Sequence, residues 1–296
     1  MNQQLISYWI RASRPFTLPA SISPVAIGTA FAFRDDSLSL VPALLCLLVA
    51  VAAQIASNFA NDYFDFLNGS DTSERIGPAR AVASGWIPAR SMLAATIITL
   101  AFVCLCGLCI VAIAGWELLA AGVAIVACVV AYSAGPWPLS RHGLGDACVF
   151  LFYGIIPTCL TYYAQAMRFS LPLLPLAAAT GLLAVNILVA NNCRDYEEDR
   201  RSGKRTTIVM FGLRFGRALY MFNCIVALVI LLPLILSSSL WYLVPYAAVA
   251  VLFFNSWRNL CRLSGAGLIP SLKHASRNLL LYTLLAVLAI VGSAHS

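Results

Sequence analysis

Long apolar runs alternate with short polar segments from one end of the chain to the other. A run of about 20 apolar residues is long enough to cross a lipid bilayer as an α-helix. Runs of this length that carry few charges are typical of membrane-spanning helices rather than of strands. The pattern predicts nine such helices, at about residues 16–33, 38–60, 91–114, 117–134, 145–166, 171–191, 215–236, 239–257 and 276–294.

The composition supports the same conclusion. Of the 296 residues, 61% are hydrophobic and 10% are charged, and the mean hydropathy is +0.85. A soluble domain has about a quarter of its residues charged. The longest polar segments are 61–90, 192–214 and 258–275. We therefore expect an all-α, polytopic membrane protein in which residues 1–296 form one transmembrane domain.

The distribution of Lys and Arg predicts the orientation of the helices. Cytoplasmic loops of membrane proteins carry an excess of basic residues. If the N-terminus lies in the cytoplasm and nine spans alternate, 17 of the 19 basic residues fall on the cytoplasmic side, and only Arg34 and Arg168 fall outside. We therefore predict an N-in, C-out topology. The net charge of +7 then belongs to membrane loops, which argues against nucleic acid as a partner.

An acidic cluster follows the second apolar run. It reads N-D-Y-F-D-F-L-N-G-S-D, from Asn61 to Asp71. Asp62 and Asp65 are three residues apart, so they share a helix face. Gly69 allows the chain to turn, so that Asp71 can return toward the other two acids. Ionisable groups at a membrane boundary are costly to place there, which makes these acids functional candidates.

A second acidic cluster follows the sixth apolar run. Residues 191–206 read N-N-C-R-D-Y-E-E-D-R-R-S-G-K-R-T. Asp195 and Asp199 are four residues apart and also share a helix face. Lys204 and Arg205 come shortly after them. Both clusters fall on the predicted cytoplasmic side of the membrane.

Together the two clusters predict a metal-dependent site for a polyanion. Carboxylates this close together repel each other unless a cation joins them. Oxygen ligands in such numbers suit magnesium or manganese rather than zinc, and magnesium usually binds through one or two carboxylates plus substrate phosphates. Arg80, Lys204 and Arg205 add positive charge, and this mixture is typical of a metal-bridged diphosphate. The alternative is a solvated, charged loop that only sets the topology.

Four stretches of the sequence carry a family resemblance. They read R-P-F-T-L-P-A from Arg14, N-D-Y-F-D-F-L-N-G-S-D-T from Asn61, Y-S-A-G-P-W-P-L with G-L-G-D between Tyr132 and Asp146, and the acidic stretch from Asn191. Together they resemble the UbiA superfamily of intramembrane prenyltransferases over nearly the whole chain. The spacing of the third acid in the first cluster is that of the branch that acts on 1,4-dihydroxy-2-naphthoate in menaquinone biosynthesis. One departure is G-L-G-D, where the family usually has G-L-G-E.

The resemblance implies a fold and a reaction. The nine helices would surround a central cavity in the bacterial cytoplasmic (inner) membrane. A magnesium-dependent aromatic polyprenyltransferase would move the polyprenyl group of a polyprenyl diphosphate onto 1,4-dihydroxy-2-naphthoate. Carbon dioxide and diphosphate would be lost, and the product would be a demethylmenaquinol.

The resemblance also implies roles for individual residues. The residues implied to hold two magnesium ions are Asn61, Asp62, Asp65, Asp71, Asp195 and Asp199. Those implied to bind the diphosphate are Arg80, Arg141, Lys204 and Arg205. Those implied to contact the aromatic substrate are Arg14, Tyr132 and Asn191. Those implied to carry the catalysis are Asp65, Asp195 and Lys204.

Several alternatives stay open at this point. Tyr132 either steadies a cation with its ring or belongs to the interfacial aromatic belt, and Arg14 either pairs with a substrate carboxylate or anchors its helix. A sibling enzyme for 4-hydroxybenzoate or a haem precursor is disfavoured by the spacing of Asp71. A cation transporter would place its acids midway along the spans. An alcohol phosphatidyltransferase is disfavoured because the stretch D-G-x-x-A-R is absent.

Overall fold

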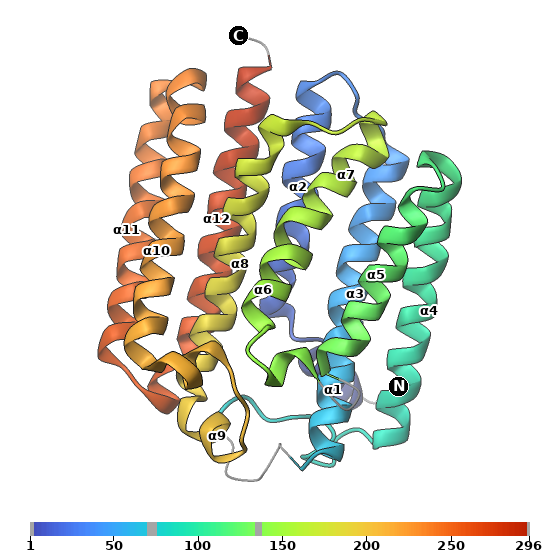
Figure 1. Cartoon of the computed structure of the whole chain (residues 1–296), viewed down its shortest axis with the longest axis vertical. Helices are drawn as coiled ribbons and strands as arrows, with labels where there is room; N and C mark the ends of the chain where they lie inside the picture. Colours follow the sequence, from blue (N-terminus) through green and yellow to red (C-terminus); the bar gives the residue numbers. More distant parts are fainter. Residues whose placement is uncertain (1–2, 70–75, 134–137, 295–296) are drawn as a thin grey trace.

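A computed structural model describes residues 3–69, 76–133 and 138–294, which contain helices and no β-strand. The membrane spans lie side by side in one bundle, with two short helices, α1 and α9, at one of its ends (Figure 1). Its helices are α1 (Gln3–Ser13), α2 (Leu18–Arg34), α3 (Leu40–Leu67), α4 (Ala89–Ala114), α5 (Leu118–Ser133), α6 (Gly145–Phe150), α7 (Ile156–Ala166), α8 (Leu174–Arg194), α9 (Tyr196–Arg201), α10 (Thr207–Ser238), α11 (Leu243–Arg262) and α12 (Ile269–Ser293). A π-helical turn, η3 (Leu151–Ile155), joins α6 to α7.

The prediction of an all-helical membrane protein is confirmed. Each of the nine predicted runs becomes a helical segment of the bundle, with α6, η3 and α7 together forming one of them. In the described part of the chain, eight helical segments are long and apolar enough to cross a membrane, and α5 is a shorter apolar helix. The two ends of the chain lie at opposite ends of the bundle (Figure 1). The N-in, C-out orientation stays a prediction.

Several helix boundaries differ from the sequence prediction, and the differences lie beside the acidic clusters. Helix α3 continues to Leu67 instead of ending near residue 60, so the first acidic cluster begins inside the helix. Helix α9 occupies part of the segment predicted to be a loop. Helix α10 begins at Thr207 and has a kink at Gly212, whose φ of 87° is outside the helical range. The hydrophobic pattern could not predict these polar turns, because contacts with other segments stabilise them.

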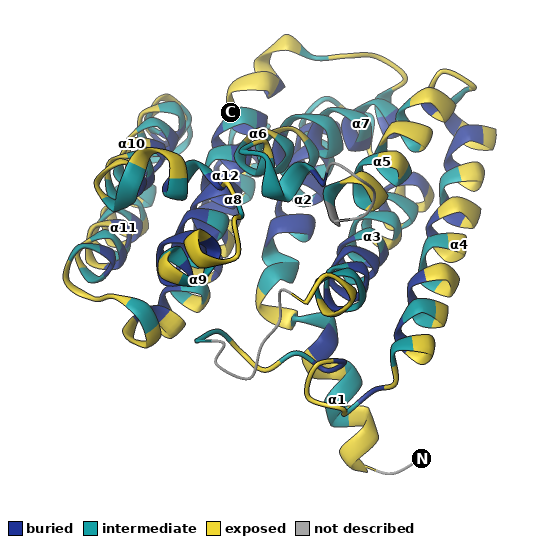
Figure 2. Ribbon diagram, turned by 60° about the horizontal axis from the view of Figure 1, so that its bottom comes forward, coloured by how far each residue is buried: buried dark blue, intermediate teal, exposed yellow. Residues whose placement is uncertain are grey.

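Helices α1 and α9 lie at the same end of the bundle (Figure 1). Helix α8 is the most deeply buried of the spanning segments, whereas much of the surface of α4 and α11 is exposed (Figure 2). The exposed side chains on the outer helices are largely apolar. An apolar outer surface is suited to contact with lipid acyl chains.

A polar cluster centred on Asp35 fastens the bundle at the end opposite to α9. The Tyr162 hydroxyl donates a hydrogen bond to Asp35 Oδ2 at 2.6 Å, and Arg34 Nη2 lies 2.9 Å from Asp35 Oδ1. Arg168 Nη2 lies 3.8 Å from the same carboxylate. Partial burial alone would raise the pKa of Asp35. The hydrogen bonds and the two positive charges outweigh it, so the pKa lies below its usual value.

The Asp35 cluster is expected to stabilise the protein in a pH-dependent way. Because the pKa is lower in the folded state, the stabilisation is complete above about pH 4 and is lost as the pH falls through the folded-state pKa. Asp35→Asn should lower the melting temperature in detergent by roughly 2–5 °C at pH 7. The difference from the unaltered protein should shrink below pH 4. Asp36→Asn, at an exposed neighbouring position, is the control, and a pH-independent difference for Asp35→Asn would contradict this account.

Candidate functional site

A cavity of about 1520 Å³ runs inside the bundle, with residues from α1 to α9 in its wall. It extends along α3 from Cys46 to Asp65, which corresponds to about 28 Å of helix. Helices α10 and α11 contribute only Thr207, among the described residues, and α12 contributes part of its first two turns. The cavity is apolar along most of its length and polar at the end where α1 and α9 lie.

The structure brings both acidic clusters to this cavity. The predicted site residues that line it are Arg14, Asn61, Asp62, Asp65, Arg80, Tyr132, Arg141, Asn191, Asp195, Asp199 and Lys204. Arg205 is exposed and is not among the lining residues. Asp71, the third acid of the first cluster, lies outside the described residues. Two segments about 130 residues apart in the sequence therefore meet at one end of the cavity.

The two described acids of the first cluster have different environments. Asp62 is buried, and its two oxygens accept hydrogen bonds from the backbone N–H groups of Ala81 and Val82, each at 3.0 Å. Asp65 is about one-third exposed, and its Oδ2 lies 3.2 Å from Arg80 Nη2. Asp62 thus holds the loop that carries Arg80 against α3. Asp65 faces the cavity with fewer constraints and is the better placed of the two to bind a ligand.

The second cluster contains an ion pair that the sequence did not single out. Arg194 is 3% exposed, and its Nε and Nη2 each lie 2.6 Å from an oxygen of Asp195. The same Nη2 donates a hydrogen bond to Asn191 Oδ1 at 2.6 Å. A two-point Arg–carboxylate pair fixes the direction of both side chains. Arg194 therefore orients Asp195 and Asn191 in the cavity wall.

Asp199 lies one turn beyond Asp195, on α9. Lys204 Nζ lies 3.2 Å from Asp199 Oδ1, and the Lys204 backbone N–H donates to the Asp199 carbonyl at 2.9 Å. Burial raises the pKa of the Asp199 carboxyl, and the negative charges of Asp195 and Glu198 add to the increase. The charge of Lys204 partly counteracts them. A buried carboxyl in this environment gains stability when a further cation binds beside it.

Two loops close the polar end of the cavity. The Arg205 backbone N–H donates to the Arg141 carbonyl at 3.0 Å, and Arg141 Nη2 donates to the Ser202 carbonyl at 3.2 Å. The Thr207 hydroxyl donates to Asp146 Oδ2 at 2.5 Å, which fastens the start of α10 to α6. Arg205 thus supports the position of Arg141 through its backbone, while Arg205 itself is exposed and does not line the cavity.

The oxygen atoms in this wall fit a divalent cation such as magnesium. Asp146 Oδ1, Glu198 Oε2 and Asp199 Oδ2 are buried and have no hydrogen-bond partner, and all three residues line the cavity. Within the described segments, no three acidic, His or Cys side chains already converge as a complete metal site. Magnesium commonly uses one or two carboxylates and takes its remaining ligands from water and substrate phosphates. The donor set therefore fits magnesium that binds together with a phosphorylated substrate.

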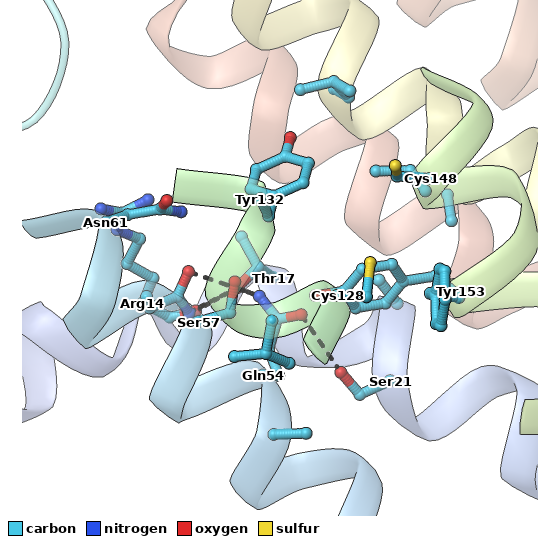
Figure 3. Close-up of a pocket in the computed structure, with 18 of the residues that line it drawn as sticks. Arg14, Thr17, Ser21, Gln54, Ser57, Asn61, Cys128, Tyr132, Cys148 and Tyr153 are labelled. Atoms are coloured by element: carbon cyan, nitrogen blue, oxygen red, sulfur yellow. Dashed lines mark hydrogen bonds between the residues drawn. The ribbon is translucent and has the colours of Figure 1, made fainter. Parts of the chain in front are cut away.

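Deeper in the cavity, polar side chains continue along α3. Figure 3 shows Gln54, Ser57 and Asn61 on one side of the cavity, with Arg14 extending toward Asn61. Tyr132, on α5, lines the same space. Arg14 itself has φ of 51°, a left-handed conformation that is uncommon for a residue other than glycine. This conformation lies at the junction between α1 and α2 and directs the Arg14 side chain into the cavity.

The sequence prediction missed Arg194, Glu198 and Gln54 as parts of the site. Arg194 was counted only as a cytoplasmic charge, although its position beside Asp195 at the end of an apolar run was a signal. Glu198 belongs to the quoted acidic stretch, but no role was predicted for it. Gln54 could have been found because it lies on the same helix face as Asn58, Asn61 and Asp65.

Comparison with known proteins identifies the family. The profile of the UbiA prenyltransferase family matches residues 21–268. The chain is 35% identical to 1,4-dihydroxy-2-naphthoate octaprenyltransferase of Escherichia coli, over 98% of each chain. It is 36% identical to the Mycobacterium tuberculosis protein of the same name, over 93% of this chain and 94% of the relative.

Solved structures show the same fold. A UbiA homologue from Archaeoglobus fulgidus, determined with DMAPP and Mg²⁺, superposes with a TM-score of 0.62 at 16% identity, over 94% of this chain and 98% of the other. An apo UbiA homologue from Aeropyrum pernix gives a TM-score of 0.66 at 14% identity, over 92% of this chain and 96% of the other. With a matching profile over most of its length and relatives above 30% identity, the chain belongs to the UbiA prenyltransferase family.

Proposed function

We propose that this chain transfers a polyprenyl group from polyprenyl diphosphate to 1,4-dihydroxy-2-naphthoate, with loss of carbon dioxide and diphosphate, to give a demethylmenaquinol. The observation that carries the proposal is one cavity with carboxylates and basic side chains at one end and an apolar interior. Near-full-length relatives named for this activity support the acceptor. The protein is a magnesium-dependent, multi-pass enzyme of the bacterial cytoplasmic (inner) membrane.

The polar end is suited to a diphosphate. Asp65, Asp195 and Asp199, with Asn61 and Asp62 beside them, would hold two magnesium ions, which when bound would neutralise the diphosphate and make it a better leaving group. Arg80, Arg141 and Lys204 line the same space and can contact the remaining phosphate oxygens. Lys204 and Arg80 already pair with acids of the two clusters, so their charges face the position that the diphosphate would occupy.

The apolar interior is suited to the polyprenyl chain and to a reactive carbocation. When the bond between the allylic carbon and the diphosphate oxygen breaks, the positive charge must be kept from water until the acceptor attacks. The Tyr132 ring borders the polar end, where it can stabilise that charge. The ring carbon that bears the carboxylate then forms the new bond, and loss of carbon dioxide restores the aromatic ring.

Arg14, Asn61 and Asn191 line the cavity together with the acidic clusters, and the proposal places the aromatic acceptor beside them. A guanidinium is suited to a carboxylate, because it offers donors in a fixed planar arrangement. We therefore assign Arg14 to the carboxylate of the naphthoate. That carboxylate is the group lost in the reaction, so Arg14 would position the reacting carbon beside the allylic carbon.

Removal of metal tests the proposed function directly. Purified protein in lipid nanodiscs, supplied with 1,4-dihydroxy-2-naphthoate, a polyprenyl diphosphate and Mg²⁺, should give demethylmenaquinol, detected by mass spectrometry. EDTA should abolish product formation, and added Mg²⁺ should restore it. Product from 4-hydroxybenzoate but not from the naphthoate would assign a different acceptor. Product formation that EDTA leaves unchanged would refute the metal-dependent mechanism.

A further inference from the structure

A row of polar side chains continues along α3 from the first acidic cluster into the apolar part of the bundle. Gln54, Ser57, Asn58, Asn61 and Asp62 stand at positions i, i+3, i+4, i+7 and i+8 and therefore share one helix face. All five line the cavity. Gln54 lies about 12 Å along the helix axis from Asp62. It is thus a polar group deep in the cavity, well away from the carboxylates that would bind magnesium.

The hydrogen bonds around Gln54 fix the direction of its amide. The Thr17 hydroxyl donates its only hydrogen to the Arg14 carbonyl at 2.9 Å, so toward Gln54 it can only accept. Gln54 Nε2 therefore faces Thr17 Oγ1, at 2.9 Å. The other end of the amide, Oε1, accepts a hydrogen bond from the Ser21 hydroxyl at 3.4 Å (Figure 3).

This arrangement leaves acceptor capacity on the amide oxygen. Both N–H groups of Gln54 are used, because Nε2 also donates to Asn58 Oδ1 at 3.4 Å. The oxygen can accept two hydrogen bonds and is given one, which is long. Gln54 is 6% exposed, and the surface it retains belongs to the cavity wall. An unused acceptor in a water-poor space is suited to a ligand that donates a hydrogen bond, such as a phenol.

The chemistry of the acceptor identifies which group would donate. The 1-hydroxyl of the naphthoate is adjacent to its carboxylate, so the two can form a hydrogen bond within the substrate. The 4-hydroxyl lies on the other side of the same ring, across from the 1-hydroxyl, and needs a partner from the protein. If the carboxylate lies near Arg14 and the diphosphate lies at the acidic clusters, the 4-hydroxyl extends into the cavity that Gln54 borders.

We propose that Gln54 is a specificity-determining residue, whose amide oxygen accepts a hydrogen bond from the 4-hydroxyl of the aromatic acceptor. Thr17 is then a positioning residue, because it fixes the direction of the Gln54 amide. This inference rests on the proposed function. It adds a reason why the enzyme would prefer a dihydroxy acid to a monohydroxy acid of the same shape.

The test compares two acceptors that differ only in that hydroxyl, 1,4-dihydroxy-2-naphthoate and 1-hydroxy-2-naphthoate. The unaltered protein in nanodiscs should prefer the dihydroxy acid by about tenfold or more in kcat/KM. Only the dihydroxy acid has a 4-hydroxyl that can donate a hydrogen bond to the buried Gln54 oxygen. Gln54→Leu should lose most of this preference, chiefly through a higher KM for the dihydroxy acid. Gln165→Leu is the matched control, because Gln165 is equally buried and hydrogen-bonded but does not line the cavity.

The outcomes separate this inference from the proposed function. An unchanged preference in Gln54→Leu would overturn the role of Gln54 while leaving the enzyme's activity in place. Failure of the unaltered protein to prenylate either acceptor would overturn the proposed function, and the role of Gln54 with it. If Gln54→Leu does not fold, Thr17→Val decides the question. Without the Thr17 hydroxyl, the Gln54 amide can rotate and turn its nitrogen, instead of its oxygen, toward the cavity. Thr17→Val should then reduce the preference, and an undiminished preference would refute the proposal.

Discussion

Asp65→Ala and Asp195→Ala are each expected to reduce kcat/KM by at least about 1000-fold, because a metal-binding carboxylate contributes several kcal/mol of charge stabilisation in the transition state. Both side chains line the polar end of the cavity, one in each acidic cluster. If one magnesium-bound diphosphate bridges the clusters, the loss of either acid removes half of the site. The two variants should therefore be similarly inactive, although Asp65 lies on α3 and Asp195 lies between α8 and α9.

The same two variants should differ in stability. Asp65 is partly exposed, and its ion pair with Arg80 is open to solvent on one side, so removing Asp65 should hardly change the melting temperature. Asp195 is paired at two points with Arg194, which is 3% exposed. Removing one partner of a buried ion pair leaves an uncompensated charge and costs about 3–5 kcal/mol. Asp195→Ala should thus lose both activity and stability.

The measurement combines turnover in nanodiscs with thermal unfolding in detergent. Glu197→Gln is the control, since Glu197 lies between Asp195 and Asp199 in the sequence but is exposed and is not among the lining residues. It should keep nearly full activity and stability. Turnover above a few per cent of normal in Asp65→Ala would show that the first cluster only sets the topology, as the alternative interpretation of the sequence holds.

The sequence predicted the bundle well because one physical requirement governs it. Every backbone polar group inside a bilayer must be satisfied within the protein, so long apolar runs have to become helices. The apolar runs that form α4, α8 and α11 could be predicted to be helices without knowing which segments they pack against. Helix α1 was missed because it is short and only partly apolar, and the end of α3 was missed because Asp62 is stabilised by backbone N–H groups of a distant loop.

The candidate site was predictable in its chemistry and not in its geometry. Spacing on α3 was enough to place Asp62 and Asp65 on one helix face. It could not show that Asp62 caps the loop around Ala81 while Asp65 remains available, because that distinction depends on a contact 19 residues away. The role of Arg194 could not be predicted either. Arg194 is buried because α8 is the most deeply buried spanning segment, and the sequence does not show how deeply each helix is buried.

Gly181→Ala is expected to be strongly destabilising, although it adds only one methyl group. Helix α8 crosses the turn between α6 and α7 with its backbone in direct contact at Gly154 and Gly181. A Cβ atom on Gly181 would lie 2.6 Å from the Phe150 carbonyl oxygen, and one on Gly154 would lie 2.7 Å from the Gly181 nitrogen. Small residues allow such close crossings of helices in membranes. Backbone atoms cannot turn aside as a flexible side chain can, so the helices would have to separate.

Separation of the helices should cost about 1–3 kcal/mol or more and should also affect catalysis. Helix α8 carries Asn191 and Arg194 at its end, and α6 carries Asp146. The crossing therefore sets the distance between these parts of the site. A misplacement of about 1 Å can lower a rate by about 100-fold, so activity measured per folded molecule should fall as well as the melting temperature. The π-helical turn at Leu151–Ile155 lies at this contact, and such turns are frequent at functional sites.

Gly107→Ala is the matched control for this prediction. Gly107 lies inside α4, and a Cβ atom there would meet nothing within 4 Å. Alanine favours a helix over glycine by about 0.5–1 kcal/mol, so Gly107→Ala should leave the melting temperature unchanged or raise it. If Gly181→Ala melts at the same temperature as Gly107→Ala, the backbone contact is not what holds α8 against the η3 turn. A lower melting temperature together with lower activity per folded molecule would instead show that this crossing sets the geometry of the site from within the membrane.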